Sequence, residues 1–445
     1  MRTFARLLIM GAVLLVALQL VRPSIPSKPA TAEVQTSTQI RHILEKDCYS
    51  CHSDERRLSW FDEIVPGYWL VRHDILTARE HLDFSTLGSK PAAAQKAKLF
   101  EAVNMVQLGA MPLASFLKLH HDARVTPEEL ATLKSYLAPW SAPPPALDAS
   151  ALAAPGPISL AFVPPEFGGF PLDPAFEGWK TISATDRGDN NTFRSIVGND
   201  IAVKSAQSGK ISPWPDGTRF AKIAWQQTFD QDGLIHPGKL VQIEMMAKDA
   251  KRYKDTDGWG WGLGQDLKPF GEDAHFVNEC TSCHLPVRGD DYVYTLPITA
   301  AKVGTAEVVN NRAALPGNLP YQPLAWDSIT MYVDPRDRTM AILFGDETAM
   351  NAVRGRKVRR SEAPEYTAGT VLALVTWAQR DDPHWFGARI PDSPRSVEFL
   401  QVGASGQANS YRRFAGTKLT EAHLAPDVAA QRASSVLKLA PAWLP

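Results

Sequence analysis

The chain has 445 residues, which is too long for a single hydrophobic core and suits two to four domains. Its 44% hydrophobic and 21% charged residues are ordinary for globular protein. The 47 Lys and Arg residues nearly cancel the 48 Asp and Glu residues, so the net charge gives no reason to expect nucleic acid as a partner.

The N-terminus has the charged-then-apolar order of a secretory signal. Arg2 and Arg6 precede the apolar run LLIMGAVLLVALQL, which is short for a membrane span. The ATA that resembles a cleavage site lies about ten residues beyond this run. We therefore expect residues 1–32 to be a signal peptide or an N-terminal membrane anchor. In both cases the body is exported to the periplasm, either soluble or tethered to the inner membrane.

Residues 36–139 have helical periodicity. TPEELATLKSYL carries Thr126 as N-cap, Pro127 at the first helical position and Glu129 completing a capping box. GYWLVRHDILTAREHL and AAAQKAKLFEAVNMVQL have the same period. The Pro- and Ala-rich segment 140–158 has no period and predicts a semi-rigid linker.

Beyond the linker the period changes to that of strands. WKTISATD, GTRFAKIAWQQ and KLVQIEMMA alternate like strands, whereas TFRSIVGNDIAVKSAQSG, at residues 192–209, is predicted as a helix. This pattern indicates an antiparallel α+β domain over residues 159–300.

The tail repeats the spacing of that domain. WKTISATDRGDNNTFRSIVGND and WDSITMYVDPRDRTMAILFGDE both place Trp and Gly 19 residues apart, and GTRFAKIAW matches GTVLALVTW in its first two residues and its last. Shared spacing over two blocks predicts that residues 310–445 are a diverged second copy. The copy contains no cysteine.

All four cysteines lie in two C-x-x-C-H motifs, CYSCH and CTSCH. This pattern attaches c-type haem, because two thiols bond to the porphyrin edge and the adjacent histidine ligates the iron. A redox C-x-x-C pair or a four-cysteine zinc site would leave both histidines unexplained. We therefore predict two covalently attached c-type haems and no disulfide. The attachment and ligand residues are Cys48, Cys51, His52, Cys280, Cys283 and His284.

The first motif begins KDCYSCHSDERRLSWFDEIVPGYWLVRHDILTAREHLDFS, and GAMPL follows about sixty residues after the motif. This order resembles the bacterial haem-binding domain family over residues 38–140. The resemblance implies a small helical electron-transfer cytochrome with His52 below the iron and Met111 above it. A lone methionine is more often core filler, but this one stands at a helix end before a proline. Alternative ligands are Met105, His120 and His121.

The second motif follows PWPDGTRFAKIAW and LVQIEMMAKDAKRYKDTDGWGWGLG. This order resembles the cytochrome P-460 family over residues 165–297, whose antiparallel β-fold also occurs in cytochromes c prime-beta. The resemblance implies a five-coordinate iron on His284 with an open face for hydroxylamine or nitric oxide. By motif position, Lys222 corresponds to the lysine that cross-links to the porphyrin in catalytic members. Arg194 corresponds to a distal-pocket arginine and Glu244 to a pocket glutamate.

These three charged residues also have ordinary interpretations. Lys222 alternates onto an apolar strand face, where an ammonium group is costly unless it is paired, reacted or able to reach water. Arg194 at a helix start and Glu244 in a strand would ordinarily be surface charges. In the second copy Lys222 aligns with Leu374 and Arg194 with Ala341, so both charges are lost where the cysteines are lost. Whether Glu398 corresponds to Glu244 is left open.

We therefore expect a multidomain dihaem cytochrome, with a helical c-type domain and two α+β, mainly antiparallel β, P-460-like domains at 159–300 and 310–445. The second haem would bind and oxidise hydroxylamine or nitric oxide, with Glu244 taking protons and Arg194 orienting the substrate. The first haem would relay electrons to an acceptor such as a periplasmic cytochrome. Alternatives are a nitric oxide carrier or sensor without turnover, in which Phe220 crowds the pocket, and plain electron transfer by both haems. The copy is expected to act in cis as the partner that a homodimer would supply.

Overall fold

The computed structural model describes residues 2–138, 166–167, 170–171, 174–265, 268–269, 280–300, 302–303, 308–354, 363–405 and 407–442. The predicted linker at residues 140–158 lies outside the described residues. The chain divides into two compact units, Met1–Trp140 and Ser141–Pro445.

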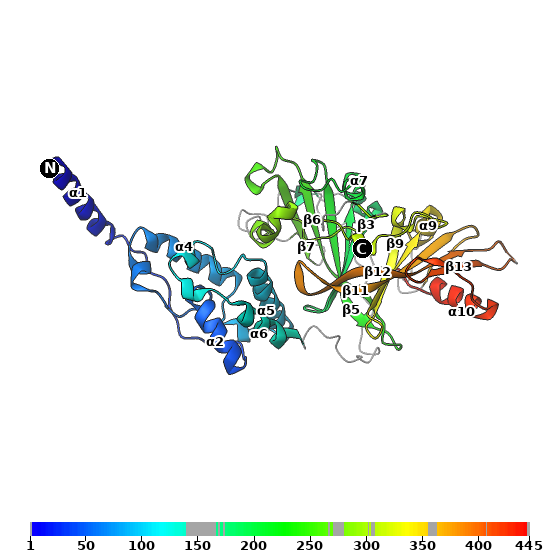
Figure 1. Ribbon diagram of the computed structural model, residues 1–445, viewed down its shortest axis with the longest axis horizontal. Helices are drawn as coiled ribbons and strands as arrows, with labels where there is room; N and C mark the ends of the chain where they lie inside the picture. The colour runs from blue at the N-terminus through cyan, green and yellow to red at the C-terminus, as the bar shows by residue number, and fades with distance from the viewer. Residues whose placement is uncertain are drawn as a thin grey trace. The chain divides into compact units, whose positions relative to one another are not determined.

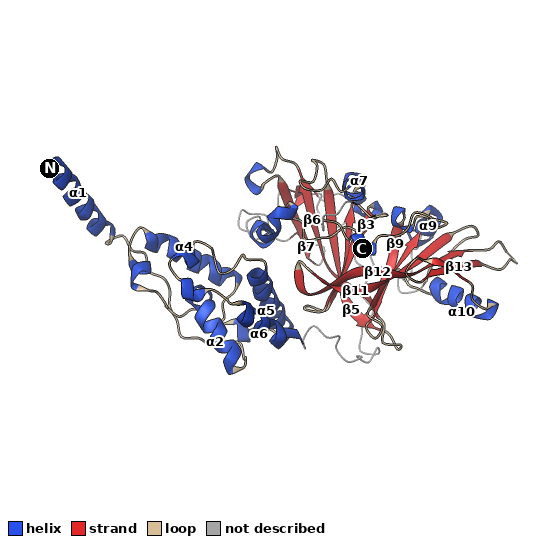
Figure 2. Ribbon diagram, in the orientation of Figure 1, coloured by secondary structure: helices blue, strands red, loops and turns tan. Residues whose placement is uncertain are grey.

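The first unit is helical. Its α-helices are α1 (Arg2–Leu18), α2 (Thr38–Asp47), α3 (Tyr49–His52), α4 (Gly67–His81), α5 (Ala92–Gln107) and α6 (Pro127–Leu137) (Figures 1 and 2). Short 3-10 turns cover Trp60–Glu63, Leu87–Ser89, Phe116–Lys118 and His121–Ala123. The capping box predicted at the start of α6 is confirmed, because Glu129 N donates to Thr126 Oγ1 at 3.2 Å and Thr126 N donates to Glu129 Oε2 at 2.8 Å.

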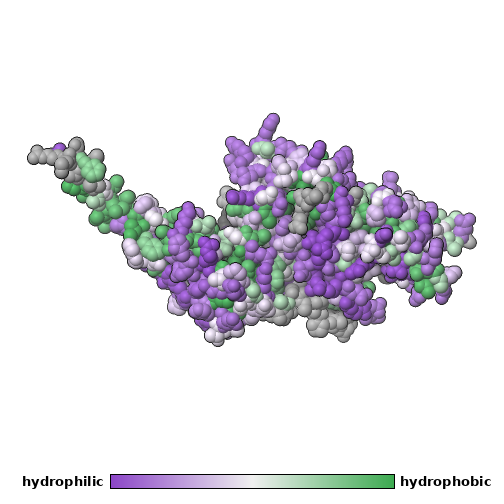
Figure 3. All heavy atoms as spheres, viewed as in Figure 1, coloured by the Kyte–Doolittle hydropathy of each residue, from purple (hydrophilic) through white to green (hydrophobic). Residues whose placement is uncertain are grey.

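Helix α1 carries the predicted apolar run. Apolar side chains cover its surface (Figure 3), including Phe4, Ile9, Met10, Val13, Leu14, Leu15 and Val16, all of which are exposed. Within the described part of the chain, no helix is long and apolar enough to cross a membrane. Whether residues 1–32 act as a signal peptide or an anchor stays a prediction.

The second unit is mainly antiparallel β. Its strands are β1 (Glu166–Phe167), β2 (Phe170–Pro171), β3 (Lys180–Arg187), β4 (Thr192–Gly198), β5 (Arg219–Phe229), β6 (Ile235–Lys248), β7 (Trp259–Gln265), β8 (Lys268–Pro269), β9 (Asp327–Asp334), β10 (Thr339–Gly345), β11 (Val371–Asp382), β12 (Trp385–Gln401), β13 (Ser410–Ala415) and β14 (Thr420–Ala422). Its helices are α7 (Asp200–Ser208), α9 (Glu347–Arg354) and α10 (Pro426–Leu437), and its 3-10 turns cover Pro174–Gly178, Lys254–Thr256, Leu285–Asp290, Asn311–Ala313 and Pro323–Ala325.

Eight of these strands close a ring. They follow one another in the order β11, β10, β9, β6, β5, β4, β3 and β12, and β12 pairs back to β11 (Figure 1). A shared hydrophobic core with side chains from all eight strands, including Trp225 and Trp377, fills this ring. The expectation of antiparallel sheet with a few helices is confirmed, and the sheet is in addition a closed ring.

One predicted element is wrong. Residues 192–209 were expected to form a helix, but residues 192–198 form strand β4 and only Asp200–Ser208 is helical. The strand alternates, since Phe193 lies in the shared core whereas Ile196 lies in a different apolar cluster. The side chain of Asn199 then accepts a hydrogen bond from Ala202 N at 3.1 Å and starts the helix.

The strand sets β3–β8 and β9–β14, called the first and second strand sets, have matching registers. Lys222 on β5 lies opposite Glu244 on β6, and Leu374 on β11 lies opposite Glu398 on β12. The register therefore places Glu398 at the position of Glu244, which the sequence alone left open.

Close contacts match between the two sets as well. A Cβ added at Gly198 would lie 2.8 Å from Ala202 Cβ, and one added at Gly345 would lie 2.6 Å from Ala349 Cβ. In both sets a glycine at the end of a strand lets the following helix, α7 or α9, pack directly on the sheet. These contacts show that the repeated glycines serve packing of a helix on the sheet.

Candidate functional site

The first C-x-x-C-H motif lies on the short helix α3. His52 Nδ1 is 2.9 Å from the carbonyl oxygen of Leu82. A carbonyl only accepts, so Nδ1 carries the hydrogen and Nε2 is left with a lone pair for a metal. Burial lowers the pKa of His52, which keeps the imidazole neutral, as an iron ligand must be.

The thiols of this motif are unsuited to redox catalysis. Burial raises the pKa of Cys48 to about 12 and also raises the pKa of Cys51. A redox C-x-x-C pair works through a thiolate with a lowered pKa, so the alternative of a thioredoxin-like pair is disfavoured here.

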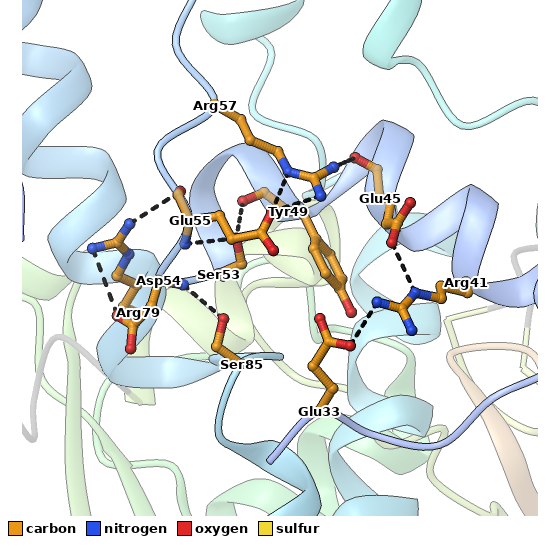
Figure 4. A network of polar contacts seen from close by, with 10 residues as sticks. All are labelled: Glu33, Arg41, Glu45, Tyr49, Ser53, Asp54, Glu55, Arg57, Arg79 and Ser85. Atoms are coloured by element: carbon orange, nitrogen blue, oxygen red, sulfur yellow. Dashed lines mark hydrogen bonds and ion pairs between the residues drawn. The ribbon is translucent and has the colours of Figure 1, made fainter. Parts of the chain in front are cut away.

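A polar network fixes the turn that follows His52 (Figure 4). Ser53 Oγ donates to Tyr49 O at 2.8 Å, and Asp54 N donates to Ser85 Oγ at 2.9 Å. The guanidinium of Arg57 lies over the Tyr49 ring, 5.2 Å from its centroid. The motif is therefore held at both ends of α3, and the hydrogen bond to Leu82 O directs the His52 ring.

The predicted sixth ligand, Met111, is half-buried in the loop after α5, where its N donates to Met105 O at 3.1 Å. Among the alternative ligands, His120 is already engaged, because its Nε2 is 3.0 Å from Asp62 Oδ2. His121 is exposed. Ligation by Met111 stays a prediction.

The second motif, Cys280 to His284, gives its histidine the same arrangement. His284 Nδ1 donates to Tyr292 O at 2.7 Å, so Nε2 is again the nitrogen left for a metal. The imidazole packs against Trp261 and Tyr294, with ring centroids 4.5 and 5.1 Å away. Burial lowers the pKa of His284 to about 4, so the ring is neutral at pH 7.

Lys222 and Glu244 form an ion pair across β5 and β6. Burial lowers the pKa of Lys222; burial also opposes ionisation of Glu244, but Lys222 and Arg194 outweigh it and hold the pKa of Glu244 below its usual value. Their side chains nevertheless keep 25% and 29% of their accessible surface. The two charged groups are therefore surrounded by protein on most sides, which shifts their pKa values, and they still keep a surface that solvent or a ligand can reach. Both charges also act on the pKa of His284, so they lie near it.

Arg194 lies on the same strand face. It is opposite Ala224 on β5, two positions along from Lys222. The expectation that it starts a helix is wrong, because it lies inside strand β4. Its Nε is buried and has no hydrogen-bond partner among the described residues. Burial lowers the pKa of Arg194 to about 10, whereas the charges of Glu244 and Cys283 act to raise it.

These features fit a haem. A buried guanidinium nitrogen that has no partner in the described part of the chain, a neutral imidazole with Nε2 available and two nearby thiols are groups that suit a covalently bound haem with a polar open face. Residues 9–139 match the model of the haem-binding domain family, and residues 174–295 match that of cytochrome P460. The chain joins a haem-binding domain to a cytochrome P460 domain.

The two matches confirm the resemblances expected from the sequence, in the expected order. The protein is therefore a haem cytochrome, and each matched domain contains one C-x-x-C-H motif. A search of curated proteins found no match to the chain.

Other residues near the P460 site were not anticipated from the sequence. They are Arg187, Asp189, Tyr292, Tyr294 and Trp385. The string YVYT, which begins eight positions after His284, was the available signal for the two tyrosines. No local signal identifies Trp385, because the ring of strands brings it to the site from the second strand set.

The equivalent face of the second strand set is closed by a helix. Glu398, at the position of Glu244, is 3% exposed and accepts hydrogen bonds from Arg432 Nε at 2.6 Å and Tyr411 Oη at 2.6 Å. Arg432 belongs to α10, and Val436 of this helix shares a hydrophobic cluster with Leu374. In the second strand set, helix α10 therefore covers the face that is equivalent to the Lys222 face of the P460 domain.

Proposed function

We propose that this protein is an exported dihaem c-type cytochrome that binds and oxidises hydroxylamine at its P460 domain and passes the electrons through its N-terminal domain. The observation that carries the proposal is the meeting of Lys222, Glu244 and Arg194 on one strand face close to His284. A purely electron-transferring haem has no use for three charged groups on a partly buried face.

The proposed haem-binding residues are those of the motifs. Cys280 and Cys283 would attach the P460 haem and His284 would ligate its iron. Cys48 and Cys51 would attach the other haem, between His52 and Met111. When bound, the P460 haem supplies an iron with an open position for a small nitrogen ligand and an outlet for electrons.

Glu244 would act as the proton acceptor. Its pKa is held below its usual value, so it is ionised at neutral pH and can take a proton from an N-O substrate. Arg194 would orient the substrate oxygen with its Nε–H, for which the described residues provide no acceptor.

Lys222 would cross-link to the porphyrin: its amine nitrogen would bond to a porphyrin carbon with loss of one N–H and one C–H hydrogen as protons, and the two electrons released would pass to a two-electron oxidant such as a peroxide. Burial lowers the pKa of its ammonium group, which raises the fraction of the nucleophilic amine. In the second strand set, which has no cysteine to attach a haem, Leu374 takes the position of Lys222. This is expected if the lysine serves the haem.

The remaining expectations are also proposals. Residues 310–445 would be a duplicated P460-like domain that lacks haem and serves as the partner in cis. The N-terminal segment would direct export and could tether the protein to the inner membrane. The electron acceptor would be a carrier such as a periplasmic cytochrome.

The test compares the optical spectrum of the ferrous wild type with Lys222→Ala and Lys222→Arg, alongside hydroxylamine-dependent reduction of an added acceptor. We expect a Soret shoulder far to the red of the ordinary c-type band in wild type only. Lys222→Arg is the matched control, since it keeps the charge opposite Glu244 but offers no amine. Identical ordinary high-spin spectra in all three proteins, with no acceptor reduction, would contradict the proposal.

A second candidate is nitric oxide binding without turnover. Two observations favour it: Lys222 is ion-paired with Glu244, and Phe220, next to it on the same face, is buried against Trp214 with ring centroids 4.9 Å apart. A paired, charged lysine and a bulky aromatic neighbour suit a crowded ligand site. Tight nitric oxide binding with no hydroxylamine oxidation would select this candidate.

A further inference from the structure

We propose that Trp385, the first residue of β12 in the hairpin formed by β11 and β12, is a positioning residue for the P460 haem site, which is therefore incomplete without the second strand set. The inference rests on the proposed function only in that His284 ligates a haem iron. Trp385 lies outside the matched domain, in a part of the chain that carries no cysteine.

The first contact reaches the pair Arg187 and Asp189. Trp385 Nε1 donates to Asp189 Oδ2 at 3.2 Å, and the guanidinium of Arg187 lies over the indole, 4.4 Å from its centroid. Arg187 Nε donates to Asp189 Oδ1 at 2.6 Å, and a second hydrogen bond joins the same two side chains. Arg187 is 6% exposed and Asp189 is 1% exposed. Trp385 therefore fixes the orientation of a buried ion pair.

This ion pair acts on Arg194. The charge of Arg187 lowers the pKa of Arg194 and that of Asp189 raises it, so both groups lie within electrostatic reach of its guanidinium. Arg194 Nε has no hydrogen-bond partner among the described residues, so the charges of Arg187 and Asp189 act on a guanidinium that no hydrogen bond fixes at this nitrogen. Loss of the indole N–H would free Asp189 Oδ2 to attract Arg194 away from the ligand position.

The second contact reaches the side of His284. The ring of Tyr294 lies between the two residues, with its centroid 5.1 Å from that of His284 and 5.7 Å from that of Trp385. Tyr294 Oη donates to Cys283 O at 2.6 Å, and His384 Nδ1 donates to Tyr294 O at 2.7 Å. The hairpin thus holds the segment that follows the haem motif as well as the ion pair.

The reciprocal hairpin provides an internal comparison. In the first strand set Phe229 lies opposite Ile235, with five residues between them; at the same register in the second set Asp381 lies opposite Arg389, with seven between them. The shorter hairpin, DQDGL, has no aromatic residue. The added length and the tryptophan therefore occur only on the hairpin that reaches the P460 site.

The experiment measures cyanide binding to the ferric full-length protein. Trp385→Phe keeps a ring over Arg187 and beside Tyr294 but removes the donor to Asp189. We expect it to weaken cyanide binding about fivefold, as for loss of one hydrogen bond. Gln231→Ala, on the exposed tip of the reciprocal hairpin, is the matched control and should bind cyanide as the wild type does.

A double-mutant cycle tests the route of the effect. If Trp385 acts through Asp189, then Trp385→Phe combined with Asp189→Asn binds cyanide no more weakly than Asp189→Asn alone. Trp385→Leu removes the ring as well and should also shift the iron–histidine stretching band of the ferrous protein. Haem content and thermal unfolding are measured for each variant. If Trp385→Leu does not fold, Trp385→Phe and its combination with Asp189→Asn decide.

Wild-type cyanide affinity in Trp385→Phe would overturn the inference, and additive effects in the cycle would overturn its route through Asp189. This readout needs a ligand-accessible haem but no hydroxylamine turnover, so the inference survives if hydroxylamine is not the substrate. A protein without any cyanide-binding haem would overturn both the inference and the proposed function.

Discussion

Asp189 shows how a single residue couples the P460 site to pH. Burial opposes its ionisation, but Arg187 and Arg194 outweigh burial and hold the pKa of Asp189 below its ordinary value of 3.8. A carboxyl group whose pKa is lower in the folded than in the unfolded state stabilises the fold above the unfolded pKa. This stabilisation is lost as the pH falls through the folded pKa.

We therefore expect the free energy of unfolding of wild type to exceed that of Asp189→Asn by a constant amount between pH 7 and about pH 5. The difference should shrink below the ordinary pKa of 3.8. Denaturant unfolding of both proteins across this range measures it. A difference that grows on acidification would mean that burial, rather than the two arginines, dominates at this residue.

Much of the P460 site follows from residue patterns. The strand alternation around Lys222 could be predicted, because it depends on neighbours in sequence, whereas the register of β5 with β6 came from the structure. The strand containing Arg194 could not be predicted, because β4 ends at Gly198 and helix α7 begins at Asp200, with only the Asn199 cap between them. The role of Trp385 could not be predicted from the sequence, since its partner Asp189 lies 196 residues earlier in the chain.

At the scale of elements, helix α10 distinguishes the two strand sets. Its Arg432 makes two hydrogen bonds to the carboxylate of Glu398, at 2.6 and 2.9 Å. Its apolar side closes a face of the second strand set, whereas the equivalent face of the P460 domain carries charged residues. The sequence aligned Leu374 with Lys222, but no local pattern indicated which segment would cover that leucine.

We expect Arg432→Met to lower the free energy of unfolding by about 1–3 kcal/mol, because among the described residues it leaves the buried Glu398 carboxylate with the hydroxyl of Tyr411 alone, while the partly exposed position of Arg432 lets water reach the site. Chemical denaturation followed by tryptophan fluorescence measures the loss. The double variant Glu398→Leu with Arg432→Leu removes the charge as well and should recover most of it. A single variant as stable as wild type would show that α10 is held by its apolar contacts alone.

At the scale of the whole second unit, the two junctions between the strand sets differ in charge. Asp186 on β3 lies opposite Arg389 on β12, whereas Val333 on β9 lies opposite Ile235 on β6. Burial raises the pKa of Asp186, and Arg389 opposes that rise. If the first strand sets of two separate chains paired with each other, Asp186 of one chain would lie opposite Ile235 of the other and would lose its cationic neighbour. The sequence therefore favours pairing of the two strand sets within one chain.

Arg389→Ile should lower the free energy of unfolding by about 1–2 kcal/mol, because Asp186 then lacks its cation. Ile235→Arg is the matched variant, since it places the same cation against Val333, and it should destabilise the protein rather than strengthen the second junction. Urea unfolding measures both. Equal stability of Arg389→Ile and wild type would remove charge from the explanation of how the halves pair.

The pairing of β3 with β12 also determines the order in which the chain can fold. Arg187 pairs with Ala388, 201 residues later, so the ring stays open until most of the polypeptide has been made. The segment with the second haem motif emerges well before the hairpin that carries Trp385. A chain that stops short of β12 would leave β3 and β11 as unpaired edges beside an exposed apolar interior, a combination that promotes aggregation. Truncation in the cysteine-free tail should therefore reduce the amount of soluble P460 domain, although the cut lies outside it.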